Sequence, residues 1–204
     1  MKSFPNLIPI FPLSGVIYFP QTNLPLNVFE QRYLDLVNDS IRKDKLIGMI
    51  QSKKDKEVYK VGCLGKINDF QKSKDGRILI NLNGITRFEV LEEKENSKLY
   101  RVFKVNYEKF TMDLNPIKEV VNVESLMKKA KIFFEKGGLL LNWKEFDKLD
   151  LVQKINTLAM IAPITNEEKQ KLLESVSLQE KAGVLENIVN FYLHEVDFNN
   201  QTVQ

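Results

Sequence analysis

Few side chains in this sequence have the types and spacing that catalysis needs. The chain holds one cysteine, Cys63, and one histidine, His194, which rules out an internal disulfide and a zinc site built from several Cys or His residues. Cys63 stands in an apolar strand pattern, which favours a buried thiol over a reactive one. His194 precedes Glu195 on a predicted helix, a place typical of a surface side chain. These residues therefore predict no nucleophile–base pair.

Paired acids are the other candidates for proton transfer, and both pairs have structural explanations. Glu92-Glu93 precedes a charged turn, whereas Glu167-Glu168 follows Thr165 with the spacing of a capping box. The Gly65-Lys66 pair lies in a strand pattern and lacks the glycine spacing of a phosphate-binding loop. We therefore predict no catalytic residues, no cofactor and no metal ligands, and we expect a protein that is not an enzyme.

Composition and charge place the chain among ordinary globular proteins. Hydrophobic residues make up 43% of the 204 residues and charged residues 28%. No apolar run approaches the ~18 residues of a membrane span, and no signal peptide pattern opens the chain. We therefore expect a cytoplasmic protein without a membrane partner. Residues 1–110 hold 19 Lys and Arg against 13 Asp and Glu, which is mild compared with a dedicated nucleic-acid binder.

The first half of the chain has the alternating pattern of short strands. The apolar runs at 7–11 and 24–29 contain prolines, which favours positions at a sheet edge. Two more predicted strands flank Asn83-Gly84, a dipeptide typical of tight turns. Many short strands with tight turns predict a small curled sheet or pseudo-barrel. One helix interrupts this pattern, with apolar residues at helical spacing: Tyr33, Leu36, Val37 and Ile41.

The apolar spacing becomes helical from Pro116 onward. We predict about four helices packed as a bundle. The first ends at Gly137-Gly138, because glycine commonly terminates a helix. Two others begin with capping boxes at 165–168 and 177–180, which satisfy the backbone amides of a first helical turn.

This change of period predicts the domain organisation. We expect a β-rich domain at 1–112, a helical bundle at 113–198 and a disordered polar tail at 199–204. The fold class is therefore α+β, with an N-terminal β pseudo-barrel that contains one helix and a C-terminal helical bundle.

Several short segments, spread from residue 8 to about residue 185, match one family pattern in order. They are Ile8-Pro9-Ile10-Phe11-Pro12-Leu13, Leu24-Pro25-Leu26, Val28-Phe29-Glu30-Gln31-Arg32-Tyr33, Val61-Gly62-Cys63-Leu64-Gly65-Lys66-Ile67, Gly76-Arg77 with Gly84 and Arg87-Phe88, and Glu168-Lys169-Gln170-Lys171-Leu172-Leu173-Glu174. Together they resemble the Lon protease N-terminal domain. The sequence departs from the family pattern at Gln21, Cys63 and Lys181, where the family commonly has Gly, Thr and Arg.

The resemblance implies a PUA-like β-domain, a following helical bundle and a role in recognising unfolded or tagged polypeptides. Complete Lon proteases also carry an ATPase and a protease domain with a Ser-Lys dyad, and neither fits into 204 residues. We therefore expect a stand-alone substrate-binding domain that acts as a recognition module or adaptor. A separate protease or chaperone is a candidate partner. RNA binding through the basic PUA-like half is the alternative function, although no aromatic-rich basic stripe supports it.

Glu30, Gln31 and Arg32 are the candidate polypeptide-binding residues. They begin a helix directly after a strand, where backbone amides and polar side chains meet at a domain rim. A structural explanation competes, in which Glu30 complements the helix dipole and Arg32 pairs with a nearby acid. Contact with a peptide is the functional one, and edge strands containing proline would suit an extended partner.

Overall fold

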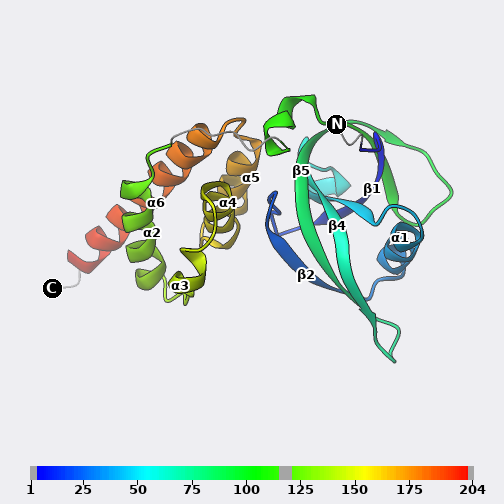
Figure 1. Ribbon diagram of the computed structural model, residues 1–204, viewed down its shortest axis with the longest axis horizontal. Coiled ribbons are helices and arrows are strands. Elements are labelled where there is room, and N and C mark those ends of the chain that lie inside the picture. Colours follow the sequence, from blue (N-terminus) through cyan, green and yellow to red (C-terminus); the bar gives the residue numbers. More distant parts are fainter. Residues whose placement is uncertain (1–3, 115–120, 202–204) are drawn as a thin grey trace. The chain divides into compact units, whose positions relative to one another are not determined.

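The chain folds into two compact units, residues 1–116 and 117–204. In this computed structural model, residues 4–114 and 121–201 are described, with 195–201 described by their backbone alone (Figure 1). The first unit is built from strands and one α-helix, and the second from helices. This is the predicted α+β class, with the division after Pro116 instead of after residue 112.

The first unit is a six-stranded sheet that closes on itself. Its elements are β1 (Leu7–Leu13), β2 (Asn23–Val28), α1 (Gln31–Arg42), β3 (Leu46–Gln51), β4 (Val61–Lys72), β5 (Ile78–Lys94) and β6 (Arg101–Asn106), with two 3₁₀ turns at Lys54–Lys56 and Glu108–Asp113. The strand order is β2-β5-β4-β3-β1-β6, and β5 also pairs with β6. That pairing closes the barrel and leaves β2 attached outside it through β5 alone.

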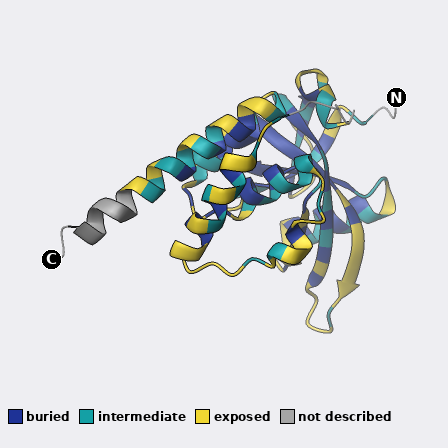
Figure 2. Ribbon diagram, turned by 60° about the vertical axis from the view of Figure 1, so that its left-hand side comes forward, coloured by how far each residue is buried: buried dark blue, intermediate teal, exposed yellow. Residues whose placement is uncertain are grey.

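The core of this unit lies inside the barrel. Each strand alternates between inward and outward side chains, so one residue in two points inward. The end of the β4–β5 hairpin extends beyond this core and is exposed, as Figure 2 shows in yellow. The buried cluster consists of Ile8, Ile10, Leu46, Ile50, Leu64, Phe88, Phe103 and Val105.

The predicted helix in the β-region is confirmed as α1. It begins after Glu30, whose backbone is extended, and packs its apolar face against β1 and β3. Tyr33, Leu36 and Val37 are buried on that face, as their spacing predicted. The start of α1 is therefore fixed against the barrel wall.

The prediction that β1 lies at a sheet edge is wrong. β1 pairs in parallel with β3 and antiparallel with β6. Pro9 lies opposite Val102 and Pro12 opposite Ile50, so both prolines stand inside paired strands. Each proline removes only one backbone donor, and the other residues of the strand retain theirs. β2, the other strand with a proline, does lie at an edge.

The prediction of a tight turn at Asn83-Gly84 is also wrong, because β5 continues through it from Ile78 to Lys94. Gly84 lies against the backbone of Phe19, where an added Cβ would clash with the Phe19 carbonyl oxygen. Its amide donates to the Thr22 carbonyl at 2.9 Å. The glycine therefore permits a close approach between backbones. The hairpin turns instead at Gly76, where φ is +88°.

The described part of the second unit contains five α-helices, where the sequence predicted about four. The predicted second helix is divided, because Asp150 starts a new helix with a capping box to Gln153. The last helix continues to Gln201, so the predicted disordered tail is helical up to that residue, and 202–204 lie outside the described residues. No described helix is long and apolar enough to cross a membrane. The helices are α2 (Glu124–Lys136), α3 (Trp143–Phe146), α4 (Leu151–Ile161), α5 (Asn166–Glu174) and α6 (Leu178–Gln201).

Candidate functional site

A hollow of about 800 Å³ opens on the surface of the first unit, residues 1–116, which we call the β-unit. It lies where the end of β1, the start of α1, the loop after β3 and the facing ends of β5 and β6 meet. Its volume lies within the range of pockets that bind ligands. The lining residues are Pro12, Leu13, Ser14, Glu30, Arg32, Tyr33, Ser52, Lys53, Asp55, Lys56, Glu57, Glu93 and Arg101.

An aromatic pair provides the base of this hollow. Tyr33 is buried and stacks on buried Phe11, with ring centroids 3.9 Å apart and planes 14° apart. The Tyr33 hydroxyl donates to the Pro12 carbonyl at 3.4 Å. Burial raises the pKa of Tyr33, so the ring stays neutral at physiological pH. The base is therefore a fixed, uncharged surface formed by α1 and β1.

Glu30 and Arg32 form an ion pair on one side of the rim. Nε and Nη2 of Arg32 both donate to the same Glu30 carboxylate oxygen, at 3.0 and 2.7 Å. The guanidinium also lies 4.5 Å from the centroid of the Tyr33 ring. The Arg32 side chain is 53% exposed and the Glu30 side chain 46%. Exposed ion pairs of this kind contribute only ~0–1 kcal/mol to the free energy of unfolding. Opening this pair to another partner therefore costs little.

Arg101 fixes the opposite side of the rim. It makes two bonds to the Glu93 carboxylate, at 2.8 and 2.6 Å, and a third to the Lys56 carbonyl at 2.7 Å. The hydrogen bonds from Arg101 lower the pKa of Glu93, which keeps that carboxylate charged. Asp55 and Lys56 both have positive φ, at 58° and 64°, a conformation that is costly for residues other than glycine. Arg101 therefore holds a strained loop at the rim.

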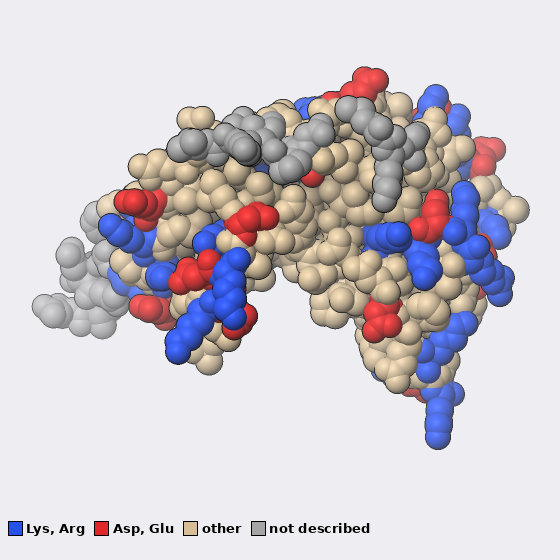
Figure 3. All heavy atoms as spheres, in the orientation of Figure 1, with Lys and Arg blue, Asp and Glu red and all other residues tan. Residues whose placement is uncertain are grey.

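Positive and negative side chains balance around the hollow. Acidic and basic side chains are also interspersed over the visible face of the β-unit in Figure 3. A polyanion such as RNA would meet as many repelling as attracting groups here, so the hollow gives RNA binding no support. The acidic lining residues are Glu30, Asp55, Glu57 and Glu93, and the basic ones are Arg32, Lys53, Lys56 and Arg101.

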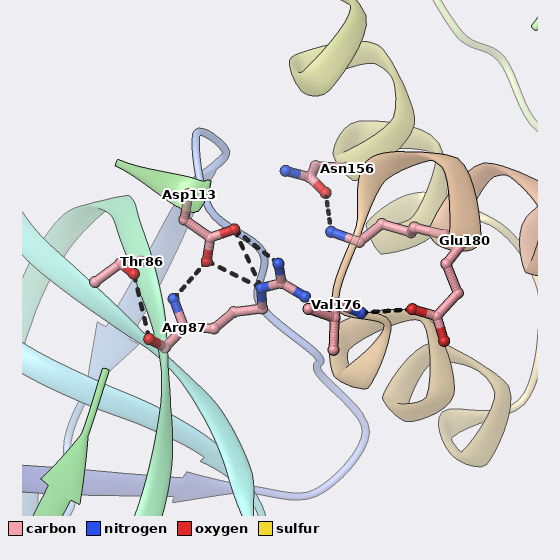
Figure 4. A network of polar contacts seen from close by, with 7 residues as sticks. Thr86, Arg87, Asp113, Asn156, Val176 and Glu180 are labelled. Carbon is pink, nitrogen blue, oxygen red and sulfur yellow. Dashed lines mark hydrogen bonds and ion pairs between the residues drawn. The ribbon is translucent and has the colours of Figure 1, made fainter. Parts of the chain in front are cut away.

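A second group of charges lies within the β-unit and is buried. Arg87 donates from Nη2 to Asp113 at 2.8 Å and from Nε at 2.9 Å, and its backbone amide bonds the same carboxylate at 2.8 Å (Figure 4). The side chains are only 3% and 9% exposed, and the guanidinium stacks on Phe110 at 4.3 Å. This pair joins β5 to the 3₁₀ turn that follows β6, so its geometry indicates a structural role.

A comparison of this sequence with models of known protein families gives one match. A family model described as the ATP-dependent protease La (LON) substrate-binding domain matches residues 7–190. The chain belongs to this family. The match covers both units, so the family relationship includes the helices as well as the barrel.

Relatives and solved structures agree with this family. A Lon protease from Syntrophus aciditrophicus is 25% identical over 97% of this chain, and one from Dictyoglomus thermophilum is 23% identical over 96%. The chain spans about a quarter of those relatives' length, at 26% and 25%. A Lon N-terminal domain protein from Xanthomonas campestris superposes with a TM-score of 0.66 at 23% identity, over 88% of this chain and 96% of that one. The N-terminal domain of Mycobacterium avium complex Lon protease gives 0.67 at 15% identity, over 90% and 98%.

Two of the three predicted binding residues line the hollow of this Lon-family chain. Glu30 and Arg32 stand at the rim, whereas Gln31 does not line it and donates to Asp35 on α1 at 2.8 Å. This bond to the residue four positions further on directs the Gln31 side chain along α1. Sequence reasoning missed Tyr33 as a site residue, although Tyr33 closes the family segment that starts at Val28.

The sequence analysis also missed Phe29, and it missed Glu93 and Arg101 on the opposite side of the rim. Phe29 directly precedes Glu30 and is 65% exposed, which is unusual for a phenylalanine. Its place between a strand and a helix was the available signal. Glu93 and Arg101 gave no signal, because they join the hollow only through the pairing of β5 with β6.

The residues that the sequence analysis considered for catalysis lie at positions that packing, exposure or helix capping explains. Cys63 is fully buried in β4, and His194 is exposed on α6. Glu168 bonds the backbone amide and hydroxyl of Thr165, which confirms that capping box. At the second predicted box, the Glu180 amide donates to Ser177, while the Glu180 carboxylate accepts from the amide of Val176 instead (Figure 4). Within the described residues, no His, Cys, Asp and Glu cluster could hold a metal ion.

Proposed function

We propose that this chain is a non-catalytic module that binds unfolded polypeptide segments, and that the hollow around Tyr33 is a contact site. The observation that carries the proposal is the hollow itself, which combines a neutral aromatic base with an exposed ion pair at its rim. The family description as a substrate-binding domain of an ATP-dependent protease supports polypeptide as the ligand.

The rim chemistry suits a ligand of variable sequence. A polypeptide presents amides and side chains of both charges, and the balanced rim offers acceptors and donors for each. The Glu30–Arg32 pair uses one carboxylate oxygen and is exposed, so either member can exchange its partner for a ligand group. Phe29, which directly precedes Glu30 and is exposed, supplies apolar area, and burial of such area drives most association between polypeptides.

The residues that line the hollow support binding of a polypeptide without its cleavage. A serine nucleophile needs a base within hydrogen-bond reach. Within the described residues, no hydrogen bond joins Ser14 or Ser52 to a lysine, and the Lys53 ammonium lies over the Tyr59 ring at 4.7 Å. The bound polypeptide would therefore be released or passed on intact, and a separate protease or chaperone is the proposed recipient.

Single substitutions at the rim test this proposal. Arg32→Ala removes both the ion pair and the cation over Tyr33, and Glu30→Ala removes the partner that orients Arg32. We expect each to weaken binding of a labelled unfolded polypeptide about threefold to tenfold, measured by fluorescence anisotropy.

Gln31→Ala is the matched control, because Gln31 is exposed on the same helical turn but does not line the hollow. It should leave the affinity unchanged. Thermal unfolding of all three variants separates weaker binding from loss of fold. Equal affinities for Arg32→Ala, Glu30→Ala and the parent chain would remove the hollow from the proposal.

A further inference from the structure

β2 is the one strand of the described six-stranded sheet that pairs on a single side. It runs antiparallel to β5, with Asn23 opposite Asn83 and Val28 opposite Ile78. An edge strand presents a row of backbone N–H and C=O groups with no partner in the sheet. The side chains alternate, with Asn23, Pro25 and Asn27 exposed and the intervening residues buried or half-buried.

The register shows which backbone groups of β2 face outward. Just before β2, the Gly84 amide donates to the Thr22 carbonyl at 2.9 Å, so Thr22 and Gly84 form a hydrogen-bonded pair. Such pairs recur at every second residue of an antiparallel ladder. Leu24, Leu26 and Val28 therefore direct their N–H and C=O groups toward β5. Asn23, Pro25 and Asn27 direct theirs away from it.

The outward row is available to another strand. Among the residues that the structure describes, the backbone amides of Asn23 and Asn27 and the carbonyls of Asn23, Pro25 and Asn27 have no hydrogen-bond partner. The side chains at these positions are exposed, so water reaches this edge. Pro25 stands where its missing N–H would have faced outward, the place where an edge strand tolerates proline.

We propose that β2 binds an extended segment of the unfolded polypeptide as an additional antiparallel strand. This inference rests on the proposed polypeptide-binding function and names how the ligand's backbone is held. Pairing through backbone groups tolerates many sequences, because every residue except proline carries the same donor and acceptor. Antiparallel pairing continues the β2–β5 arrangement and is slightly more stable per residue than parallel pairing.

Pro25 favours a foreign strand over the β2 strand of a second copy as the occupant of this edge. If two copies of β2 paired about a two-fold axis, both prolines would enter the ladder in any register that overlaps more than one outward residue. Two hydrogen bonds would be lost. A foreign strand without proline loses only the bond that Pro25 itself cannot donate. Proline therefore disfavours self-association at this edge more than capture of a ligand.

The two faces of β2 set a preference for alternating residues. Ligand residues opposite Leu24, Leu26 and Val28 would extend the apolar face, and those opposite Asn23 and Asn27 would face water. Val28 ends the strand, and only Phe29 separates it from Glu30 at the rim of the hollow. A strand along β2 thus ends beside an exposed aromatic side chain.

N-methylated peptides test the backbone contacts directly. The probe is a short fluorescent peptide that alternates Thr and Val, with lysines at its ends for solubility. In the antiparallel arrangement the Thr amides face β2 and the Val amides face away. N-methylation of the Thr residues should weaken binding about tenfold to a hundredfold, whereas methylation of the Val residues should change it less than about threefold. Equal effects of the two sets, or the reverse order, would overturn the proposal.

Variants of β2 test the same edge from the protein side. Asn27→Pro removes an outward donor without touching the bonds to β5, and Asn27→Ala keeps the donor as a matched control. We expect the proline variant to bind the Thr/Val peptide about threefold to tenfold more weakly than the alanine variant, because only the alanine variant keeps the backbone donor. Pro25→Ala adds a donor and should strengthen binding by a similar factor. Thermal unfolding confirms that each variant is folded.

The outcomes separate this inference from the proposed function. If unfolded polypeptide binds but neither methylation set nor Asn27→Pro matters, the edge proposal is overturned and the hollow remains. If no unfolded polypeptide binds at all, the proposed function itself is overturned.

Discussion

Ion pairs with the same chemistry have different roles in this chain because their exposure differs. The Arg87–Asp113 pair is almost fully buried, whereas Glu30–Arg32 is about half exposed. Removing one member of a buried pair leaves an uncompensated charge out of contact with water. Removing one member of an exposed pair leaves a solvated charge. Stability should therefore depend on the first pair, while the second remains free for ligand exchange.

This contrast predicts a large loss of stability at one position. Asp113→Ala should lower the free energy of unfolding by about 3–5 kcal/mol, because Arg87 would stay buried without its carboxylate. The control is Asp75→Ala, which breaks the exposed Arg77–Asp75 pair and should cost less than about 1 kcal/mol. Urea unfolding of both variants measures the difference. Similar losses for the two would contradict the structural role assigned to Arg87.

Local contacts were predictable at the residue scale and distant ones were not. The Thr165–Glu168 capping box could be predicted because both partners lie within one helical turn. Asp113 lies 26 residues from Arg87, and nothing in the intervening sequence marks the pairing. Gln31 shows the limit of reasoning from a motif, because its neighbours line the hollow and it does not.

Hydrophobic periodicity identified the elements but not their pairing. The spacing of Tyr33, Leu36 and Val37 predicted α1. The change from alternating to helical spacing of apolar residues separated the β-unit from the helical unit. Predictions based on proline and glycine were wrong at positions where tertiary structure determines the role of the residue. β1 contains prolines although it is paired on both sides, and Gly84 lies within a continuous strand. These residue types permit turns and edges without requiring them.

The two glycines Gly84 and Gly183 should respond in opposite directions to alanine. Gly84→Ala would place a Cβ against the Phe19 carbonyl and should destabilise the β-unit by about 1–3 kcal/mol. Gly183 is exposed in α6 with open space around it, so Gly183→Ala should stabilise that helix by about 0.5–1 kcal/mol. Thermal unfolding followed by circular dichroism checks both signs. Destabilisation by Gly183→Ala, or no effect of Gly84→Ala, would contradict these environments.

The hollow belongs to the whole β-unit, which is why the sequence could predict only part of it. It forms because β5 returns to pair with β6 and brings Glu93 and Arg101 across from the start of α1. The segment from Val28 to Tyr33 marks one side of it in the sequence. The other side depends on barrel closure, which involves residues far apart in the chain.

The most direct test of the account compares an unfolded polypeptide and an RNA as ligands at two salt concentrations. Fluorescence anisotropy of each labelled ligand would be measured at about 50 and about 200 mM salt, and gel electrophoresis would check that the polypeptide stays intact. The account predicts polypeptide binding that changes little with salt, because burial of apolar surface is not screened, together with weaker RNA binding. Tight RNA binding that falls about tenfold or more over this range, with no polypeptide signal, would contradict it.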